Sequence, residues 1–271
     1  MRIHLQLKLK NGTNMYNSLA GKVALVTGGT KGIGKSIADK LSKNGATVII
    51  TAREDQKVNV NEHYFISNDS TIAGSAQNLA KIIIDKYGRL DIIVNNVGAN
   101  LSPGGGFDAL SDEHWIQDWE LNFMSAVRIN KAFLPFMIER KSGVVINIST
   151  GAAKQPIWEM TMSYSASKAA LNVYSKALAD ELGVHGIRVN VVSPGLVKTP
   201  LMMDFIANIA KKSNASQEEV FKSILEKIGP SIQRMAEPEE VADLVNFLVS
   251  SDAKYITGIN YSIDGGALPV V

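Results

Sequence analysis

Residues 23–34 read VALVTGGTKGIG, and this stretch decides the fold. A run of apolar and β-branched residues ends in a glycine-rich turn, after which amphipathic periodicity begins at Ile33. Gly28 permits a tight turn, and Gly32 and Gly34 let backbone and ligand approach without a clashing Cβ. A turn that feeds a helix N-terminus presents free N–H groups and the positive end of the helix dipole, which suit a pyrophosphate. A plain strand-turn-helix junction is the alternative, but three glycines at this spacing favour a dinucleotide site.

Strand-like and helix-like segments alternate through the rest of the chain. The strand-like runs are residues 23–27, 47–51, 64–67, 91–95, 144–149, 187–193 and 259–263, and the helical periodicities are residues 33–43, 72–87, 112–139, 164–182 and 238–249. Strands that are apolar on both faces and separated by helices indicate a parallel sheet covered on both sides. Because such crossovers are right-handed, we expect one doubly wound α/β domain with a seven-stranded, mostly parallel sheet flanked by helices.

No change in composition divides the chain after residue 22, so we expect a single folded domain over residues 19–271. Residues 1–18 are expected to form an N-terminal extension, in which alternating apolar and polar residues indicate a short strand.

Composition excludes several classes of function. The 28 Lys and Arg residues nearly balance the 26 Asp and Glu residues and form no basic block, so nucleic acid is not an expected partner. The chain has no cysteine, which agrees with a reducing compartment, and we expect a cytoplasmic protein. No apolar run approaches the ~18 residues of a membrane span. The four histidines are dispersed, so no metal site is expected.

The end of the second predicted strand bears on the choice of cofactor. A dinucleotide site commonly has a carboxylate about 20 residues after the turn, which binds the ribose hydroxyls. Ala52 stands there instead, followed by Arg53, and Lys31 adds a cation inside the turn. A guanidinium can pair with a 2′-phosphate, which a carboxylate would repel. The alternative is that both are ordinary surface cations, but their joint placement favours NADP over NAD.

Tyr164 and Lys168 are spaced i, i+4 and therefore share one face of a predicted helix. A nearby ammonium favours the phenolate and should lower the pKa of tyrosine from about 10, which suits an acid-base group at a carbonyl oxygen. Such a pair also arises by chance, so it gains meaning only from other motifs.

Five motifs in register supply that context: TGGTKGIG at 27–34, NNVG at 95–98, YSASK at 164–168, RVNVVSPG at 188–195 and IDGG at 263–266. In this order they resemble the short-chain dehydrogenases/reductases, and the resemblance runs from about residue 19 to the C-terminus. It implies a Rossmann-type fold and hydride transfer between NADP(H) and a small-molecule carbonyl/alcohol pair, with no membrane partner.

The resemblance also implies roles for single residues. Tyr164 matches the general acid/base, Lys168 the lysine that binds the nicotinamide ribose, and Asn122 the asparagine that anchors a water-linked proton relay. Asn95 and Gly98 match positions on the adenosine side of the cleft, and Asp69 resembles a carboxylate that contacts adenine. Strand and helix capping are the alternatives for Asn95 and Asp69. The full expected cofactor-binding set is Gly28, Thr30, Lys31, Gly32, Ile33, Gly34, Arg53, Asp69, Asn95, Gly98, Tyr164, Lys168, Pro194, Gly195, Val197 and Thr199.

The sequence departs from the family at the hydroxyl that binds the substrate carbonyl. The family has a serine after its fifth strand, whereas Thr150 aligns with it here and Ser149 precedes it. A threonine hydroxyl can donate the same hydrogen bond, and its methyl group stiffens the rotamer. We expect Thr150 to fill this role, with Ser149 as the alternative.

The expected activity is that of a ketone reductase, with a 3-oxoacyl-thioester reductase as the alternative. The alternative from another class is a non-catalytic protein that senses NADP or serves as a scaffold. Such a protein is expected to lack some of the catalytic residues. Residues 199–234 are expected to form a substrate lid. The family commonly forms dimers and tetramers through its long helices and C-terminal strand, so a homodimer or homotetramer is expected.

Overall fold

The computed structural model describes residues 18–53 and 63–269. The strand expected near the N-terminus and most of the expected extension lie outside these ranges. The described residues form one seven-stranded sheet in the order β3-β2-β1-β4-β5-β6-β7, and every pair of neighbouring strands is parallel. The strands are β1 Val23–Thr27, β2 Thr47–Ala52, β3 Tyr64–Ser67, β4 Ile92–Asn95, β5 Gly143–Ile148, β6 Ile187–Pro194 and β7 Asn260–Ile263. The doubly wound α/β prediction is confirmed.

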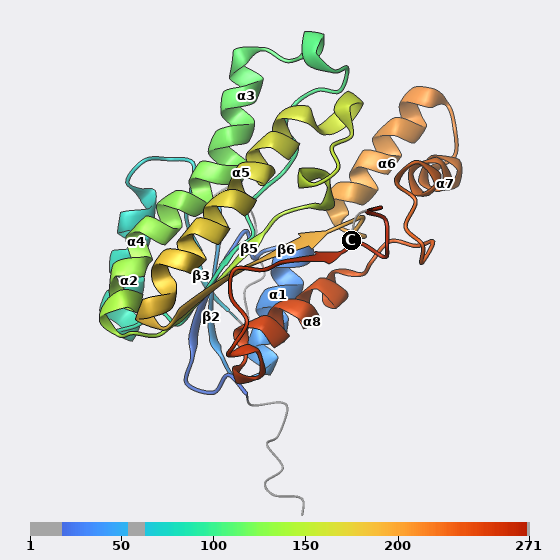
Figure 1. Ribbon diagram of the computed structural model, residues 1–271. Coiled ribbons are helices and arrows are strands. Elements are labelled where there is room, and N and C mark those ends of the chain that lie inside the picture. The colour runs from blue at the N-terminus through green and yellow to red at the C-terminus, as the bar shows by residue number, and fades with distance from the viewer. Residues whose placement is uncertain (1–17, 54–62, 270–271) are drawn as a thin grey trace, which may run out of the picture.

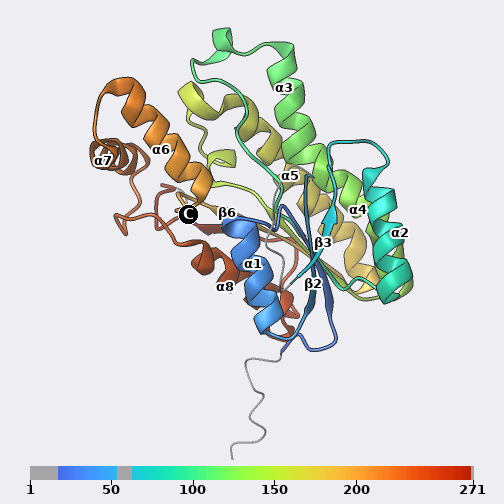
Figure 2. The same ribbon diagram turned by 180° about the vertical axis from the view of Figure 1, so that it is seen from behind.

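Helices cover both faces of this sheet (Figure 1). One face carries α1 (Gly32–Lys43) and α8 (Pro238–Val249), seen from the other side in Figure 2, and their apolar residues pack on Val26 and Val192 of the sheet. The other face carries α2 (Ser75–Tyr87), α4 (Ser125–Glu139) and α5 (Trp158–Leu182). These two apolar layers explain why the central strands are buried on both sides.

Two further helices, α6 (Pro200–Ser213) and α7 (Gln217–Ile228), stand beyond the carboxyl ends of the strands (Figure 1). Each begins at a hydroxyl residue that accepts a backbone N–H: Thr199 from Met202 and Ser216 from Glu219. They occupy the segment expected to be a lid. The remaining elements are α3 Asp112–Trp119, a π turn at Glu120–Met124 and short 3-10 turns at Phe107–Ala109, Gly151–Ala153, Gly183–His185 and Ser251–Ala253.

Three helices differ from the sequence prediction. The helix expected over residues 112–139 is interrupted by the π turn, a feature that often marks functional sites and that apolar periodicity does not reveal. Helix α2 starts at Ser75, because Gly74 has a left-handed φ of 84° that cannot extend the helix N-terminally. Helix α5 starts earlier, at Trp158, and passes through a non-helical residue at Thr161 before Tyr164.

Candidate active site

The glycine turn follows β1 at the carboxyl edge of the sheet, where open α/β sheets bind ligands. Gly28 has a φ of 64°, in the left-handed region that favours glycine. A Cβ on Gly34 would overlap the Gly28 carbonyl oxygen, so the first turn of α1 folds back against the loop. The Asn96 amide donates to the carbonyls of Thr27 and Gly28, at 3.0 and 3.1 Å, and so fixes the loop from the β4 side.

Asn96 is a residue that sequence reasoning missed. The structure directs the side chain of its neighbour Asn95 inward, where it donates to Asn130 and Asn147 in a buried amide cluster. Asn95 is 4% exposed, so it supports the sheet and offers no polar side-chain atom to the cleft in this conformation. The doublet of asparagines in NNVG was the available signal, but only the strand pleat decides which of the two faces the turn.

The loop after β6 contacts the glycine turn from the other side. A Cβ on Gly32 would lie 3.3 Å from Thr199 Cγ2, which places the start of α6 directly beside the turn. Pro194 ends β6, and Gly195 packs so closely on Asp264 that a Cβ would lie 2.9 Å from the Asp264 Cα. Val197 is buried next to this loop. The structure therefore brings the residues of the expected nicotinamide loop to the turn.

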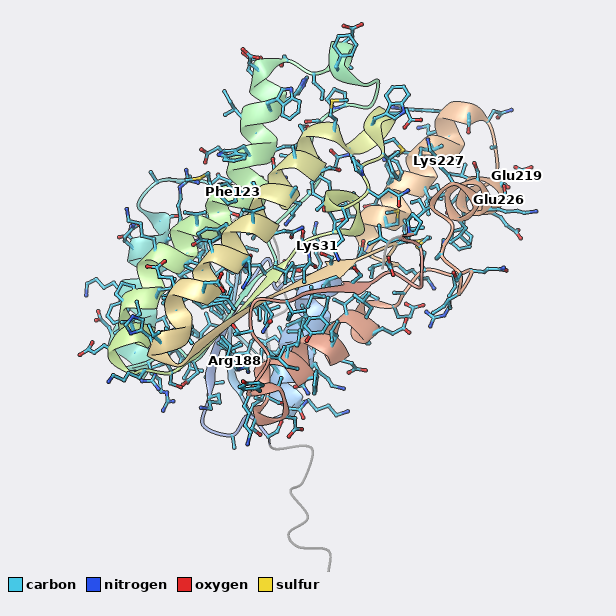
Figure 3. All side chains as sticks on the ribbon, in the orientation of Figure 1. Lys31, Phe123, Arg188, Glu219, Glu226 and Lys227 are labelled. Carbon is cyan, nitrogen blue, oxygen red and sulfur yellow. The ribbon has the colours of Figure 1, made fainter. Side chains whose placement is uncertain are left out.

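The expected adenosine side lies at the ends of β2 and β3. The Gly29 N–H donates to the Thr51 carbonyl at 3.2 Å, which joins the turn to the end of β2 just before Arg53. Arg53 is exposed and lines one cavity together with Asp69. Lys31, labelled in Figure 3, is exposed at the N-cap of α1. Asp69 also accepts the N–H and hydroxyl of Thr71, at 2.9 and 2.7 Å, so one of its oxygens stabilises the turn before α2.

Lys168 and Asn122 meet at Gly98, beyond the end of β4. A Cβ at Gly98 would lie 2.7 Å from Lys168 Nζ and 2.8 Å from Asn122 Oδ1, so glycine is required for this close approach. Lys168 is 2% exposed and its Nζ donates to the Ile148 carbonyl at 2.8 Å. Burial lowers the pKa of Lys168 to about 7, because the ammonium loses water. Asn122, inside the π turn, accepts from the Ala99 N–H at 3.0 Å and donates to the Ala99 carbonyl at 2.9 Å.

Tyr164 lies one turn before Lys168 on α5, with Thr150 as its hydrogen-bond partner. Burial, with a further contribution from the negative charge of Asp118, raises the pKa of Tyr164 to about 12, although the Thr150 hydrogen bond acts in the opposite direction. The sequence argument expected the Lys168 ammonium to lower this pKa. Desolvation dominates in this structure and Lys168 is not among the groups that shift this pKa, so Tyr164 is a protonated phenol at neutral pH.

The two hydroxyl residues after β5 point in different directions. The Ser149 hydroxyl is buried and directed at the Lys168 carbonyl, 3.4 Å away, on the body of α5. Thr150 accepts the Ala152 N–H at 3.2 Å and contacts Tyr164. This placement supports Thr150 as the hydroxyl that faces a substrate.

We predict that Thr150→Ala lowers kcat by about ten- to a hundred-fold, the effect of losing one hydrogen bond to a carbonyl oxygen that gains negative charge. Ser149→Ala should leave kcat within about three-fold, because it removes only a long hydrogen bond to a backbone carbonyl of α5. Steady-state kinetics of both variants provide the comparison. A large loss confined to Ser149→Ala would reverse the assignment.

These residues fit a dinucleotide bound across the carboxyl edge. The glycine turn offers backbone N–H groups at the N-terminus of α1, and Gly98 leaves room next to the Lys168 ammonium. Beyond them, a hydroxyl and a phenol stand where a carbonyl could accept two hydrogen bonds. Among the described residues, no cluster of His, Asp and Glu could hold a metal ion, and no helix is long and apolar enough to cross a membrane. A fold and a site of this kind define a nicotinamide-dependent oxidoreductase.

Comparisons with known proteins identify the family. The model of the short chain dehydrogenases matches residues 22–210. The uncharacterized oxidoreductase YvaG of Bacillus subtilis is 36% identical over 261 residues, covering 93% of this chain and 98% of that protein. The 3-oxoacyl-(acyl-carrier-protein) reductase FabG of Vibrio cholerae is 32% identical, covering 92% of this chain and 98% of that protein. The L-sorbose reductase of Gluconobacter frateurii, solved in complex with NADPH and L-sorbose, has a TM-score of 0.86 at 32% identity, covering 95% of this chain and all of that one. The chain belongs to the short-chain dehydrogenase/reductase family.

Proposed function

We propose that this protein is an NADPH-dependent reductase that converts a ketone into a secondary alcohol. The observation that carries the proposal is that Lys168 and Asn122 meet at Gly98, and that Tyr164, one helical turn from Lys168, is hydrogen-bonded to Thr150. The NADPH complex of the L-sorbose reductase supports the cofactor. NADPH supplies a hydride to the carbonyl carbon, and the protein supplies the proton and the geometry.

Each side chain has a defined task in this mechanism. Tyr164 and Thr150 donate hydrogen bonds to the carbonyl oxygen, and the Tyr164 proton moves to that oxygen as charge develops on it. Lys168 holds the ribose next to the nicotinamide, and its positive charge stabilises the phenolate left on Tyr164. Asn122 lies next to Lys168 at Gly98 and anchors the water-linked path that returns a proton.

Two alternative functions are compatible with the same fold and site. A 3-oxoacyl-thioester reductase uses the same chemistry, and the similarity to FabG of Vibrio cholerae favours testing it directly. A non-catalytic NADP-binding protein would need only the cradle, and the complete set of acid, hydroxyl and lysine groups argues against it.

The proposal is tested by following NADPH oxidation with a panel of ketones, sugars with a keto group, aldehydes and 3-oxoacyl thioesters. We expect turnover of a free ketone. Turnover of thioesters alone would favour the alternative reductase. NADPH binding without turnover of any carbonyl would favour the non-catalytic alternative.

The preference for NADPH is proposed to depend on Arg53 and Lys31, which are exposed on the adenosine side of the turn. Arg53→Ala should raise the KM for NADPH by about ten- to a hundred-fold, the cost of losing charge-assisted hydrogen bonds to a 2′-phosphate. The KM for NADH should change little. Lys254→Ala, an exposed cation beside the cavity at the opposite edge of the sheet, is the matched control. An equal loss with both cofactors would contradict this role for Arg53.

The proposal also covers the oligomeric state of the protein and its location in the cell. We propose a homodimer or homotetramer in the cytoplasm, built through α4, α5 and β7, because large apolar side chains are exposed on α5 and on adjoining α3, including Val173 and Ile116. Light scattering should give two or four times 29.3 kDa, and a monomeric mass would refute it.

Helices α6 and α7 are proposed to close over the substrate. An ion pair of 3.3 Å between Glu159 and Lys227, which is labelled in Figure 3, joins the start of α5 to the end of α7.

A further inference from the structure

Asp118, in the last turn of α3, is a carboxylate with no exposed surface. Its donors are all neutral: the Leu101 N–H at 3.1 Å and the hydroxyls of Ser102 and Ser163, both at 2.6 Å. Asp91, also buried, shows the usual arrangement, because it pairs with the guanidinium groups of Arg89 and Arg140. The hydroxyl distances at Asp118 match those of hydrogen bonds to an ionised carboxylate. This negative charge is therefore buried with no cation from residues 18–53 or 63–269 paired with it.

Burying a charge in this way is costly, and such a group is retained only where its hydrogen bonds or its field have a use. The location of Asp118 indicates what that use is. Ser163 immediately precedes Tyr164 in α5, so one hydrogen bond separates the carboxylate from the backbone that carries the phenol. The Asn122 amide donates to the Asp118 carbonyl at 3.0 Å, one turn further along.

The same carboxylate also holds the loop that follows Gly98. Leu101 and Ser102 belong to this loop, and the Ser163 hydroxyl lies 2.8 Å from that of Ser102. Asp118 thus ties together the π-turn end of α3, the loop that brings Gly98 to Lys168, and the segment of α5 that presents Tyr164.

We propose that Asp118 is a positioning residue for proton donation: its buried carboxylate clamps the loop after β4 to α5 and so holds the Tyr164 phenol in place to donate its proton. This inference rests on the proposed reductase function. It predicts that the placement of Tyr164 depends on the hydrogen bonds between this carboxylate and the two serine hydroxyls.

Asp118→Ala removes the clamp, whereas Asp118→Asn keeps its shape, because the amide oxygen can accept from Leu101 while the NH2 group donates to the two serine hydroxyls. We expect Asp118→Ala to lower kcat for ketone reduction by about ten-fold, within the range for a misplaced catalytic group, with the KM for NADPH nearly unchanged, and Asp118→Asn to recover most of that loss. Asp91→Asn is the matched control, because it removes a carboxylate of similar burial at the opposite edge of the sheet. It should lower stability and leave kcat nearly unchanged.

Ser163→Ala and Ser102→Ala keep the carboxylate and weaken the clamp, and they also test the proposal if Asp118→Ala does not fold. We expect each to lower kcat by about ten-fold, within the range for a misplaced catalytic group, with the KM for NADPH nearly unchanged. Wild-type kcat in Asp118→Ala, or in both serine variants, overturns the proposal. If the wild-type protein reduces no carbonyl, or if Tyr164→Phe stays active, the proposed function itself is wrong, which is a different result.

Discussion

Tyr164→Phe is expected to lower the rate of NADPH-dependent ketone reduction by about a thousand-fold, within the range attributed to general acid catalysis. The substitution removes only the hydroxyl, so the ring keeps its packing on α5. The carbonyl oxygen then gains charge without a proton donor, and Thr150 supplies one hydrogen bond in place of two. NADPH binding, followed by cofactor fluorescence, should change by less than about three-fold, since the phenol contributes at most one hydrogen bond to the cofactor.

The raised pKa of Tyr164 predicts how the rate of each direction of the reaction depends on pH. At a pKa of about 12 the phenol carries its proton throughout the usual assay range, so it is a donor for reduction. The reverse oxidation must first remove that proton, and its rate should rise with pH. An oxidation rate that is independent of pH between about 7 and 10 would contradict this assignment.

Tyr174→Phe is the matched control for Tyr164→Phe. Tyr174 lies on the same helix, its pKa is also raised by burial, and its hydroxyl accepts from the Asn130 amide at 3.3 Å. It does not reach the residues around Gly98 that form the proposed site. We expect full activity from Tyr174→Phe, and comparable losses in both variants would indicate that the effect is structural.

The second large effect is expected at the glycine turn. Gly34→Ala places a methyl group against the Gly28 carbonyl oxygen and the Asn96 amide, and both must move. Overpacking of this kind costs about 1–3 kcal/mol of folding stability. The N–H groups that face a pyrophosphate are displaced as well, so NADPH affinity should fall about a hundred-fold, which corresponds to about 3 kcal/mol.

Gly183→Ala tests whether that loss is specific to the turn. Gly183 has a helical φ of −57°, and a Cβ there would meet no atom within 4 Å. An alanine at such a position is tolerated, and it stabilises slightly by restricting the unfolded chain. Thermal unfolding and NADPH titration of the two variants give the comparison. Normal cofactor affinity in Gly34→Ala would show that the turn does not hold the pyrophosphate.

Much of the fold could be predicted from the sequence because it depends on local pattern. Strands apolar on both faces alternate with amphipathic helices, and that period alone specifies a parallel sheet between two helical layers. The glycines after β1 were identifiable because a tight turn and a close approach exclude any larger residue. Tyr164 and Lys168 were identifiable because the helical repeat sets i and i+4 on one face.

Only the tertiary structure decided how the polar side chains around that pair are used. The choice between Ser149 and Thr150, and between Asn95 and Asn96, depends on which way each side chain points after a buried strand, and an error of one residue in alignment reverses it. The raised pKa of Tyr164 depends on burial by residues distant in sequence. Asp118 appeared in the sequence as one more acidic residue of an amphipathic helix. It became a buried charge beside the proposed proton donor only when the loop after β4 and α5 closed around it.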